Sequence, residues 1–250
     1  MKVILLGATG MVGQGVLREC LLDPQAETVL GIGRSATGQQ HEKLHEVILD
    51  NLADLSSVES RLSGYDACFF CLGASAAGMK EEEYRCVTYH LTVSVAATVL
   101  KLNPAMTFIY VSGSGTDSTE RGRMMWARVK GRTENAILRM PFRAVYMFRP
   151  GYIQPLHGIR TKTKWYGAIY AVMSPLYPVW KWLVPNYVTT TECIGLAMLQ
   201  VTKQGSPKCV LENQDINRIC GAFRADVTGT SQTLSQKDRG PVDFGTGRST

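Results

Sequence analysis

Three glycines near the start of the chain have the spacing of a turn that holds a phosphate. Gly7, Gly10 and Gly13 form G-x-x-G-x-x-G directly after the apolar run KVILL, where a helical pattern begins. Glycine here permits a tight turn, lets an anion approach the backbone, and lets the helix pack closely on a strand. The N–H groups of Met11 and Val12 then face the anion at the helix start. The chemistry predicted is binding of the pyrophosphate of a dinucleotide.

The residue after the second predicted strand indicates which dinucleotide is preferred. A protein selective for NAD usually carries Asp or Glu there, because a carboxylate accepts hydrogen bonds from the ribose hydroxyls. No acid occurs between Glu27 and Glu42, and Arg34 stands at the strand end instead. A guanidinium can hold the 2′-phosphate of NADP by paired hydrogen bonds. The sequence therefore predicts a preference for NADP(H) over NAD(H).

The elements that must position these residues alternate between strand and helix patterns, which is typical of a parallel sheet. Strands are predicted at 2–6, 28–32, 46–50, 67–72, 107–112 and 144–148. Helices are predicted at about 12–22, 52–62, 81–102, 124–139 and, with threonine caps, 190–203. The expected fold is α/β, a doubly wound parallel-sheet Rossmann fold. It occupies residues 1–213 as one domain, with a small C-terminal cap at about 152–205.

Two of these predictions place individual side chains. In the helix at 81–102, a buried face is expected to carry Val87, Leu91, Val95 and Val99. Since ligands of such folds bind beyond the carboxyl ends of the strands, residues after the third and fourth strands should line the nucleotide. Asp50 and Asn51, after the third strand, would lie by the adenine. The residues after the fourth strand would line the ribose and nicotinamide side, and they are Leu72, Gly73 and Ala74.

Composition and charge narrow the class of partner. The chain has 250 residues, 45% of them hydrophobic, and a formal net charge of +6. The positive excess is concentrated at residues 121–149, which hold eight Lys/Arg against the single acid Glu134. No zinc-finger or helix-turn-helix pattern accompanies it, so nucleic-acid binding is not favoured. A solvated helix face, an anionic substrate or a partner surface each fit the basic residues, which include Arg121, Arg123, Arg128 and Arg132.

The cysteines and histidines predict neither disulfides nor a metal site. Seven cysteines, an odd number, occur in a chain too large to need disulfide staples, which favours reduced thiols in the cytoplasm. Cys68 and Cys71 form a CxxC inside an apolar run, where a strand would point them to opposite faces of the sheet. Core packing is therefore expected for both. The four histidines show no ligand spacing.

Two segments near the C-terminus depart from the alternating pattern. Residues 166–185 are apolar and aromatic, but three prolines argue against a membrane-spanning helix. A substrate-pocket lining or a subunit interface is favoured there over peripheral membrane contact. Residues 214–250 are rich in Gly, Ser, Thr and Gln and lack apolar periodicity, so they are predicted to be a disordered tail.

Several motifs together resemble a known family. They are LLGATGMVGQG, GRS at 33–35, DACFFCLGAS at 66–75, YVSGSGTD at 110–117, WARVKGRTE at 126–134 and FRPGYI at 148–153. The chain thereby resembles an atypical branch of the short-chain dehydrogenase/reductase superfamily. It is similar to the Tat-interacting-protein-like oxidoreductases and to epimerase/dehydratase-like NAD(P)-binding proteins. The likeness covers roughly residues 2–155.

The resemblance implies a catalytic Ser, Tyr and Lys, with Tyr-x-x-x-Lys on one helix. Lys130 matches, and its expected work is to bind the nicotinamide ribose and lower the pKa of the phenol. Ser112 or Ser114 would orient a substrate carbonyl or hydroxyl, and the sequence does not choose between them. Trp126 stands where the tyrosine should be, and an indole N–H cannot supply a proton at a useful pKa. Another group, such as Tyr110, Tyr152 or a water chain, would have to serve as the acid/base.

Two hypotheses for function follow. One is an NADP(H)-dependent oxidoreductase acting on a small carbonyl or hydroxyl compound with a displaced proton donor. The other is a non-catalytic binding or regulatory protein that responds to NAD(P)H. The expected cofactor contacts are Gly7, Thr9, Gly10, Met11, Val12, Gly13, Arg34, Asp50, Asn51, Leu72, Gly73, Ala74, Lys130 and Ile153.

Overall fold

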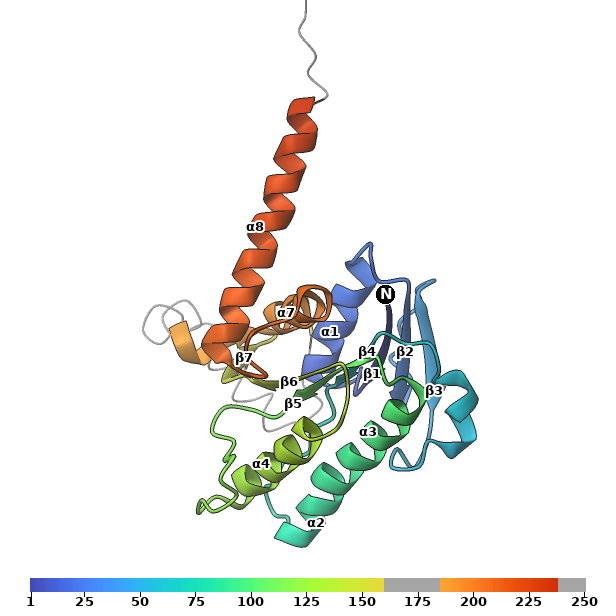
Figure 1. Cartoon of the computed structure of the whole chain (residues 1–250), viewed down its shortest axis with the longest axis vertical. Helices are drawn as coiled ribbons and strands as arrows, with labels where there is room; N and C mark the ends of the chain where they lie inside the picture. Colours follow the sequence, from blue (N-terminus) through green and yellow to red (C-terminus); the bar gives the residue numbers. More distant parts are fainter. Residues whose placement is uncertain (160–184, 238–250) are drawn as a thin grey trace, which may run out of the picture.

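The computed structural model of the chain describes residues 1–159 and 185–237. Within these residues, seven parallel strands form one sheet in the order β3-β2-β1-β4-β5-β6-β9, with helices on both faces (Figure 1). The α/β doubly wound fold is therefore confirmed. The strands are β1 Lys2–Leu6, β2 Thr28–Gly33, β3 Leu44–Ile48, β4 Ala67–Phe70, β5 Thr107–Val111, β6 Ala144–Arg149 and β9 Val210–Glu212.

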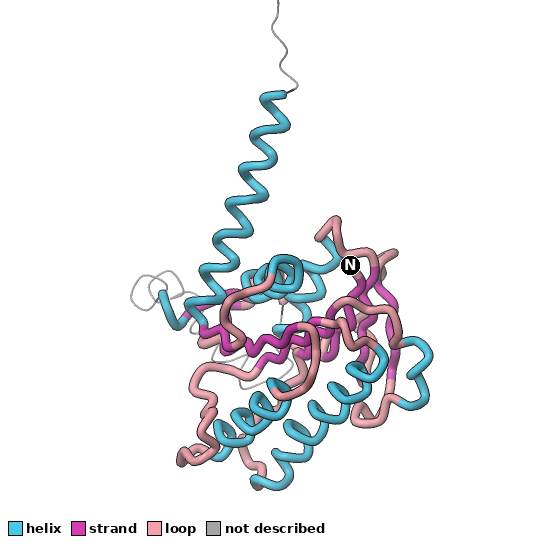
Figure 2. Tube along the Cα trace, viewed as in Figure 1, coloured by secondary structure: helices cyan, strands magenta, loops and turns pink. Residues whose placement is uncertain are grey.

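The helices form two layers that sandwich the sheet (Figure 2). One face carries α1 (Met11–Leu22) and α7 (Thr191–Gln204), and the other carries α3 (Leu91–Leu102) and α4 (Met125–Leu138). A short helix α2 (Glu81–Arg85) and a π-helical turn (Cys86–His90) lead into α3. The long helix α8 (Asn213–Lys237) begins beside α7, and its far end runs away from the body of the molecule (Figure 1).

Alternating side chains of the central strands build a core on each face. On β1, Val3 and Leu5 pack toward α1 and α7, whereas Ile4 and Leu6 pack toward α3 and α4. All four side chains are fully buried, because a parallel sheet covered by helices on both faces leaves neither side in water. This is why the strand sequences are continuously apolar. The sheet is thus a rigid support for the loops at its carboxyl edge.

The boundaries of two elements differ from the sequence predictions. Strand β3 lies at Leu44–Ile48, two residues earlier than predicted, because the apolar run continues past the last paired residue. The helix predicted at 52–62 is a 3-10 helix at Ser56–Arg61. Capping was predicted well at α7, where the Thr190 hydroxyl accepts a hydrogen bond from the Cys193 N–H at 3.0 Å.

The C-terminal region corrects two expectations. Helix α7 was assigned to a cap, but it packs on α1 in the helix layer, so closely that a Cβ on Gly15 would lie 2.6 Å from the Thr191 Cβ. The tail predicted to be disordered, residues 214–250, contains nearly all of α8, whose Ile216 and Cys220 are buried against the rest of the fold.

Of the expected cap, a small two-stranded parallel sheet is described. It pairs β7 (Tyr152–Gln154) with β8 (Val188–Thr190), which follows the 3-10 turn Pro185–Tyr187. The remainder, residues 160–184, lies outside the described residues, and so does almost all of the aromatic segment at 166–185. Residues 238–250 of the predicted tail lie outside them as well.

A disulfide bond overturns the expectation that all the cysteines are reduced. Cys193 in α7 is bonded to Cys220 in α8, with Cα atoms 5.2 Å apart across a sequence separation of 27. The packing of α8 on α7 brings them together, which spacing alone does not reveal. Cys68 and Cys71 are free thiols on opposite faces of the sheet, as predicted.

Candidate functional site: a nucleotide cleft and a buried lysine

The glycine turn joins β1 to α1 through contacts that larger residues would block. Gly7 has φ +84°, and a Cβ on it would lie 2.8 Å from the backbone carbonyl carbon of Cys71. A Cβ on Gly13 would lie 2.0 Å from the Gly7 oxygen, so this glycine is what lets α1 pack against the turn. Gly10 donates its N–H to the Gly7 oxygen at 2.9 Å and precedes the first helical residue.

The side of the turn at Gly10 is open. A Cβ there would approach only the Gly7 oxygen, at 3.3 Å. Thr9, Met11 and Val12 are half-exposed around it. The first N–H groups of a helix have no partner within the helix, so this opening presents hydrogen-bond donors and the positive end of the helix dipole. The cradle fits a phosphate group.

A cleft of about 420 Å³ lies at the carboxyl ends of β2, β3 and β4. It lies beside the point where the strand order changes direction, since β2 and β3 extend from β1 on one side and β4 and β5 on the other. In doubly wound sheets such a switch point is the usual ligand site. The cleft brings together six residues predicted from the sequence, and they are Arg34, Asp50, Asn51, Leu72, Gly73 and Ala74.

Arg34 is exposed and forms no ion pair with another described residue. The remaining walls of the cleft were not predicted, and they are Leu52, Ala53, Met79, Cys86, Val87 and Leu91. Val87 was expected in the core but is 43% exposed, whereas Val95 and Val99 are buried as predicted. The π-helical turn at Cys86–His90 shifts the helical register, which moves Val87 from the core to the cleft.

Lys130 and Trp126 lie one turn apart on α4, as the motif requires. The Lys130 Nζ donates a hydrogen bond to the backbone oxygen of Ser112, just past the end of β5. It lies 6.0 Å from the centroid of the Trp126 ring, whose far edge reaches toward Gly115. Burial lowers the pKa of Lys130 to about 8, although the carboxylate of Glu134 partly opposes that shift.

The two candidate serines have different environments. The Ser112 hydroxyl is buried and donates to Glu134 Oε1 at 2.5 Å, with the Phe148 oxygen at 3.3 Å. Its side chain is therefore committed to the protein interior. Ser114 is half-exposed, and its N–H donates to the Pro150 oxygen at 2.8 Å. Ser114 is the serine placed to meet a ligand.

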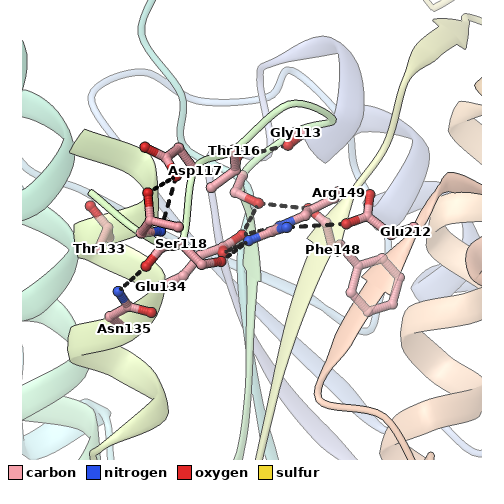
Figure 3. A network of polar contacts seen from close by, with 12 residues as sticks. Gly113, Thr116, Asp117, Ser118, Thr133, Glu134, Asn135, Phe148, Arg149 and Glu212 are labelled. Atoms are coloured by element: carbon pink, nitrogen blue, oxygen red, sulfur yellow. Dashed lines mark hydrogen bonds and ion pairs between the residues drawn. The ribbon is translucent and has the colours of Figure 1, made fainter. Parts of the chain in front are cut away.

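The Glu134 carboxylate that accepts from Ser112 also forms an ion pair with Arg149, which the sequence did not predict. Figure 3 shows Glu134 and Arg149 with their neighbours. Arg149, at the end of β6, donates from Nε to Glu134 Oε1 at 3.0 Å and also pairs through Nη2 with Oε2. It further contacts Ser118 at 2.6 Å and Glu212 at 3.1 Å. The hydrogen bonds to Glu134 raise the pKa of Arg149. The signal in the sequence was Glu134 itself, the one acid among eight basic residues.

The alternative proton donors named from the sequence are placed differently. Tyr110 is 1% exposed, packs on Phe70 at 5.8 Å between centroids, and has its pKa raised by burial. Tyr110 is therefore a core residue, and its hydroxyl cannot donate a proton to a bound substrate. Tyr152 is half-buried, and its hydroxyl donates to Gln154 at 3.1 Å. Ile153, a predicted cofactor contact, packs partly against the core beneath α1 and α7.

Among residues 1–159 and 185–237, no three His, Cys, Asp or Glu side chains gather as metal ligands would. No helix in that part of the chain has the length and apolar character needed to cross a membrane.

Comparison with known proteins identifies a nucleotide-binding domain. Residues 2–109 match the family described as semialdehyde dehydrogenase, NAD binding domain. Protein fmp52, mitochondrial, from Aspergillus niger is 30% identical over 159 residues, which are 61% of this chain and 66% of that protein. Protein FMP52, mitochondrial, from Saccharomyces cerevisiae is 27% identical over 167 residues, which are 66% of this chain and 69% of that protein. The match thus spans just under two thirds of the Aspergillus relative's length.

Solved structures share the fold at low sequence identity. The enzyme WbmG from Bordetella bronchiseptica, solved with NAD, gives a TM-score of 0.62 at 12% identity, covering 91% of this chain and 78% of WbmG. UDP-N-acetylglucosamine 4-epimerase from Methanobrevibacter ruminantium gives 0.60 at 15% identity, covering 84% of this chain and 74% of the epimerase. These likenesses show the fold. The family match and the glycine cradle support binding of a nicotinamide dinucleotide.

The same comparisons correct the predicted cellular location. The relatives from Aspergillus and Saccharomyces are named mitochondrial proteins, which contradicts the prediction of a cytoplasmic location. The cytoplasmic prediction depended on seven reduced cysteines. The bond between Cys193 and Cys220 removes that premise.

Proposed function

We propose that this Rossmann-fold protein is an NADP(H)-dependent oxidoreductase of the atypical short-chain dehydrogenase/reductase type. Its substrate is a small carbonyl or hydroxyl compound. The observation that carries the proposal is the adjacency of two sites along one sheet edge. The nucleotide cleft lies at the ends of β2, β3 and β4, and Lys130 meets the end of β5, the next strand.

Each group has a role in this reaction. The open side of Gly10 and the N–H groups of Met11 and Val12 hold the pyrophosphate. Arg34 holds the 2′-phosphate, and Leu72, Gly73 and Ala74 line the ribose and nicotinamide side of the cleft. The bound cofactor supplies or accepts a hydride. Ser114 orients the substrate oxygen, because the Ser112 hydroxyl is occupied by Glu134.

The cofactor preference is tested by calorimetric titration of NADPH and NADH. We expect the wild-type protein to bind NADPH more tightly, and Arg34→Gln to lose about 10- to 100-fold in NADPH affinity while NADH affinity changes little. Arg139→Gln is the matched control, because Arg139 is exposed at the end of α4, outside the cleft. Tighter binding of NADH by the wild-type protein would contradict the role given to Arg34.

Catalysis is tested by NADPH oxidation across a panel of aldehydes and ketones. Turnover that falls in Lys130→Ala supports an oxidoreductase. Cofactor binding without turnover on any carbonyl would favour the second candidate, a non-catalytic protein that responds to NAD(P)H. The observation favouring that candidate is Trp126, whose indole fills the place of an acidic phenol.

Replacing Trp126 with tyrosine separates the two candidates further. If Trp126→Tyr gains activity that the wild-type protein lacks, the wild-type chain is a binding protein with a disabled catalytic site. If Trp126→Tyr loses activity that the wild-type protein has, the indole shapes a working pocket.

A further inference from the structure

The surroundings of Trp126 leave few groups able to move a proton. The indole N–H is a donor without a useful acidity. Tyr110 is enclosed in the core, and the hydroxyl of Ser112 is held by Glu134. Ser114 is accessible, but a serine hydroxyl is a very weak acid and requires a base or acid behind it. The Lys130 amine also lies beside Trp126, with Nζ 6.0 Å from the centroid of the ring.

We propose that the Lys130 amine is itself the proton donor of the reduction, in the place that a tyrosine phenol would otherwise take. This inference rests on the proposed function. Its basis is the position of Nζ, which is hydrogen-bonded to the Ser112 oxygen and lies beside the indole ring. A Cβ on Gly113 would be 3.7 Å from Nζ, so the missing side chain at Gly113 leaves space next to the amine.

The hydrogen-bonding capacity of the amine fits this role. An ammonium group has three N–H donors. One is committed to the Ser112 oxygen, which anchors the group at the end of β5. The others are available to a substrate oxygen and to the ribose of the cofactor. Ser114, two residues further along the same loop, is the neighbour that can share the substrate oxygen.

The electrostatic setting makes the amine a usable acid near neutral pH. Burial lowers the pKa of Lys130 to about 8, and the best general acids have a pKa near the working pH. The charged group facing it from its own helix is Glu134, which is itself paired with Arg149 from β6. On the β5 side, Asp117 turns its carboxylate to the Gly122 N–H and the Thr119 hydroxyl.

The proposed step balances as follows. A bound NADPH would supply the hydride for the new C–H bond at the carbonyl carbon, and the π electron pair of the carbonyl would move onto its oxygen. The Nζ–H bond breaks, and that proton forms the O–H bond of the alcohol. The neutral amine then takes a proton from water. The carbonyl compound is reduced and NADPH is oxidised.

One test needs no turnover. In protein labelled with ¹³C at the lysine ε-carbons, the Lys130 resonance, assigned by its loss in Lys130→Met, is followed against pH. We expect a midpoint near 8 for the Lys130 resonance. A Lys130 midpoint above 10 would overturn the proposal, because the amine would then be too weak an acid.

A second test separates proton donation from charge. Lys130→Arg keeps a cation for the ribose but lacks a dissociable proton, so we expect kcat to fall at least about 100-fold while NADPH affinity changes about threefold or less. In Lys130→Ala, added methylamine or ethylamine should restore part of kcat. The fold of each variant is checked by circular dichroism and by its NADPH affinity.

The outcomes distinguish this inference from the proposed function. If the wild-type protein turns over and Lys130→Arg retains that activity, the amine only holds the cofactor and the inference is wrong. A loss of kcat confined to Ser114→Ala would also overturn it. If the wild-type protein turns over no carbonyl at all, the proposed function fails, and with it the reaction that this inference describes, whatever the NMR titration shows.

Discussion

The two halves of the sheet build their sites from different parts of the polypeptide. Around β1 to β4 the site consists largely of backbone, with the Gly7–Gly13 turn, the start of α1 and the strand ends. Around β5, β6 and α4 it consists of side chains, and each depends on a partner distant in sequence. Substitutions that enlarge a residue should therefore disrupt the first half, and substitutions that remove a side-chain group should disrupt the second.

The largest effect is expected in the second half, from removing Glu134. Glu134→Ala leaves the guanidinium of Arg149 buried with only the half-exposed Glu212 opposite it, and we expect a loss of about 3–5 kcal/mol in the free energy of unfolding. Urea denaturation followed by circular dichroism measures it. Glu212→Ala is the matched control, with an expected loss below about 1 kcal/mol. Equal losses in the two variants would contradict a central role for Glu134.

Next in size is the bond that ties α8 to α7. Opening Cys193–Cys220 frees a loop of 27 residues in the unfolded chain, which predicts a loss of about 3 kcal/mol on reduction. Thermal melts with and without dithiothreitol measure it, and mass spectrometry of unreduced peptides identifies the pair. The double variant Cys193→Ala/Cys220→Ala should not respond to reductant. A wild-type melt that is unchanged by dithiothreitol would argue against this bond.

The smallest effects on stability are expected in the first half, where two glycines form a matched pair. In Gly13→Ala the new Cβ meets backbone at 2.0 Å, so we expect a loss of about 1–3 kcal/mol. Gly10 has φ −78° and a nearest contact of 3.3 Å, so Gly10→Ala should cost below about 1 kcal/mol. Gly10→Ala should instead lower the affinity for NADPH about tenfold or more, because the new methyl group occupies the open side of the turn, where the phosphate binds. An unchanged NADPH affinity in Gly10→Ala would show that the pyrophosphate binds elsewhere.

The same contrast explains which predictions from the sequence succeeded. The glycine turn after β1 was predictable, and so was the convergence of Arg34, Asp50 and Leu72 on one cleft, because strand periodicity and turn residues are local signals. Val87 was misplaced, since a π-helical turn leaves no mark in a pattern of apolar residues. Helix α8 was missed because its buried residues, Ile216 and Cys220, gain their partners from α7 and β9.

By itself, the sequence determined the doubly wound fold and the phosphate cradle, because each rests on residues close together in the chain. Only the tertiary structure decided that Ser112 is held by Glu134, that Cys193 meets Cys220, and that Lys130 is buried enough for its pKa to fall. Hydrogen bonding, disulfide pairing and desolvation depend on which distant groups fold into contact. A pattern of residues along the chain does not show which distant groups will come into contact on folding.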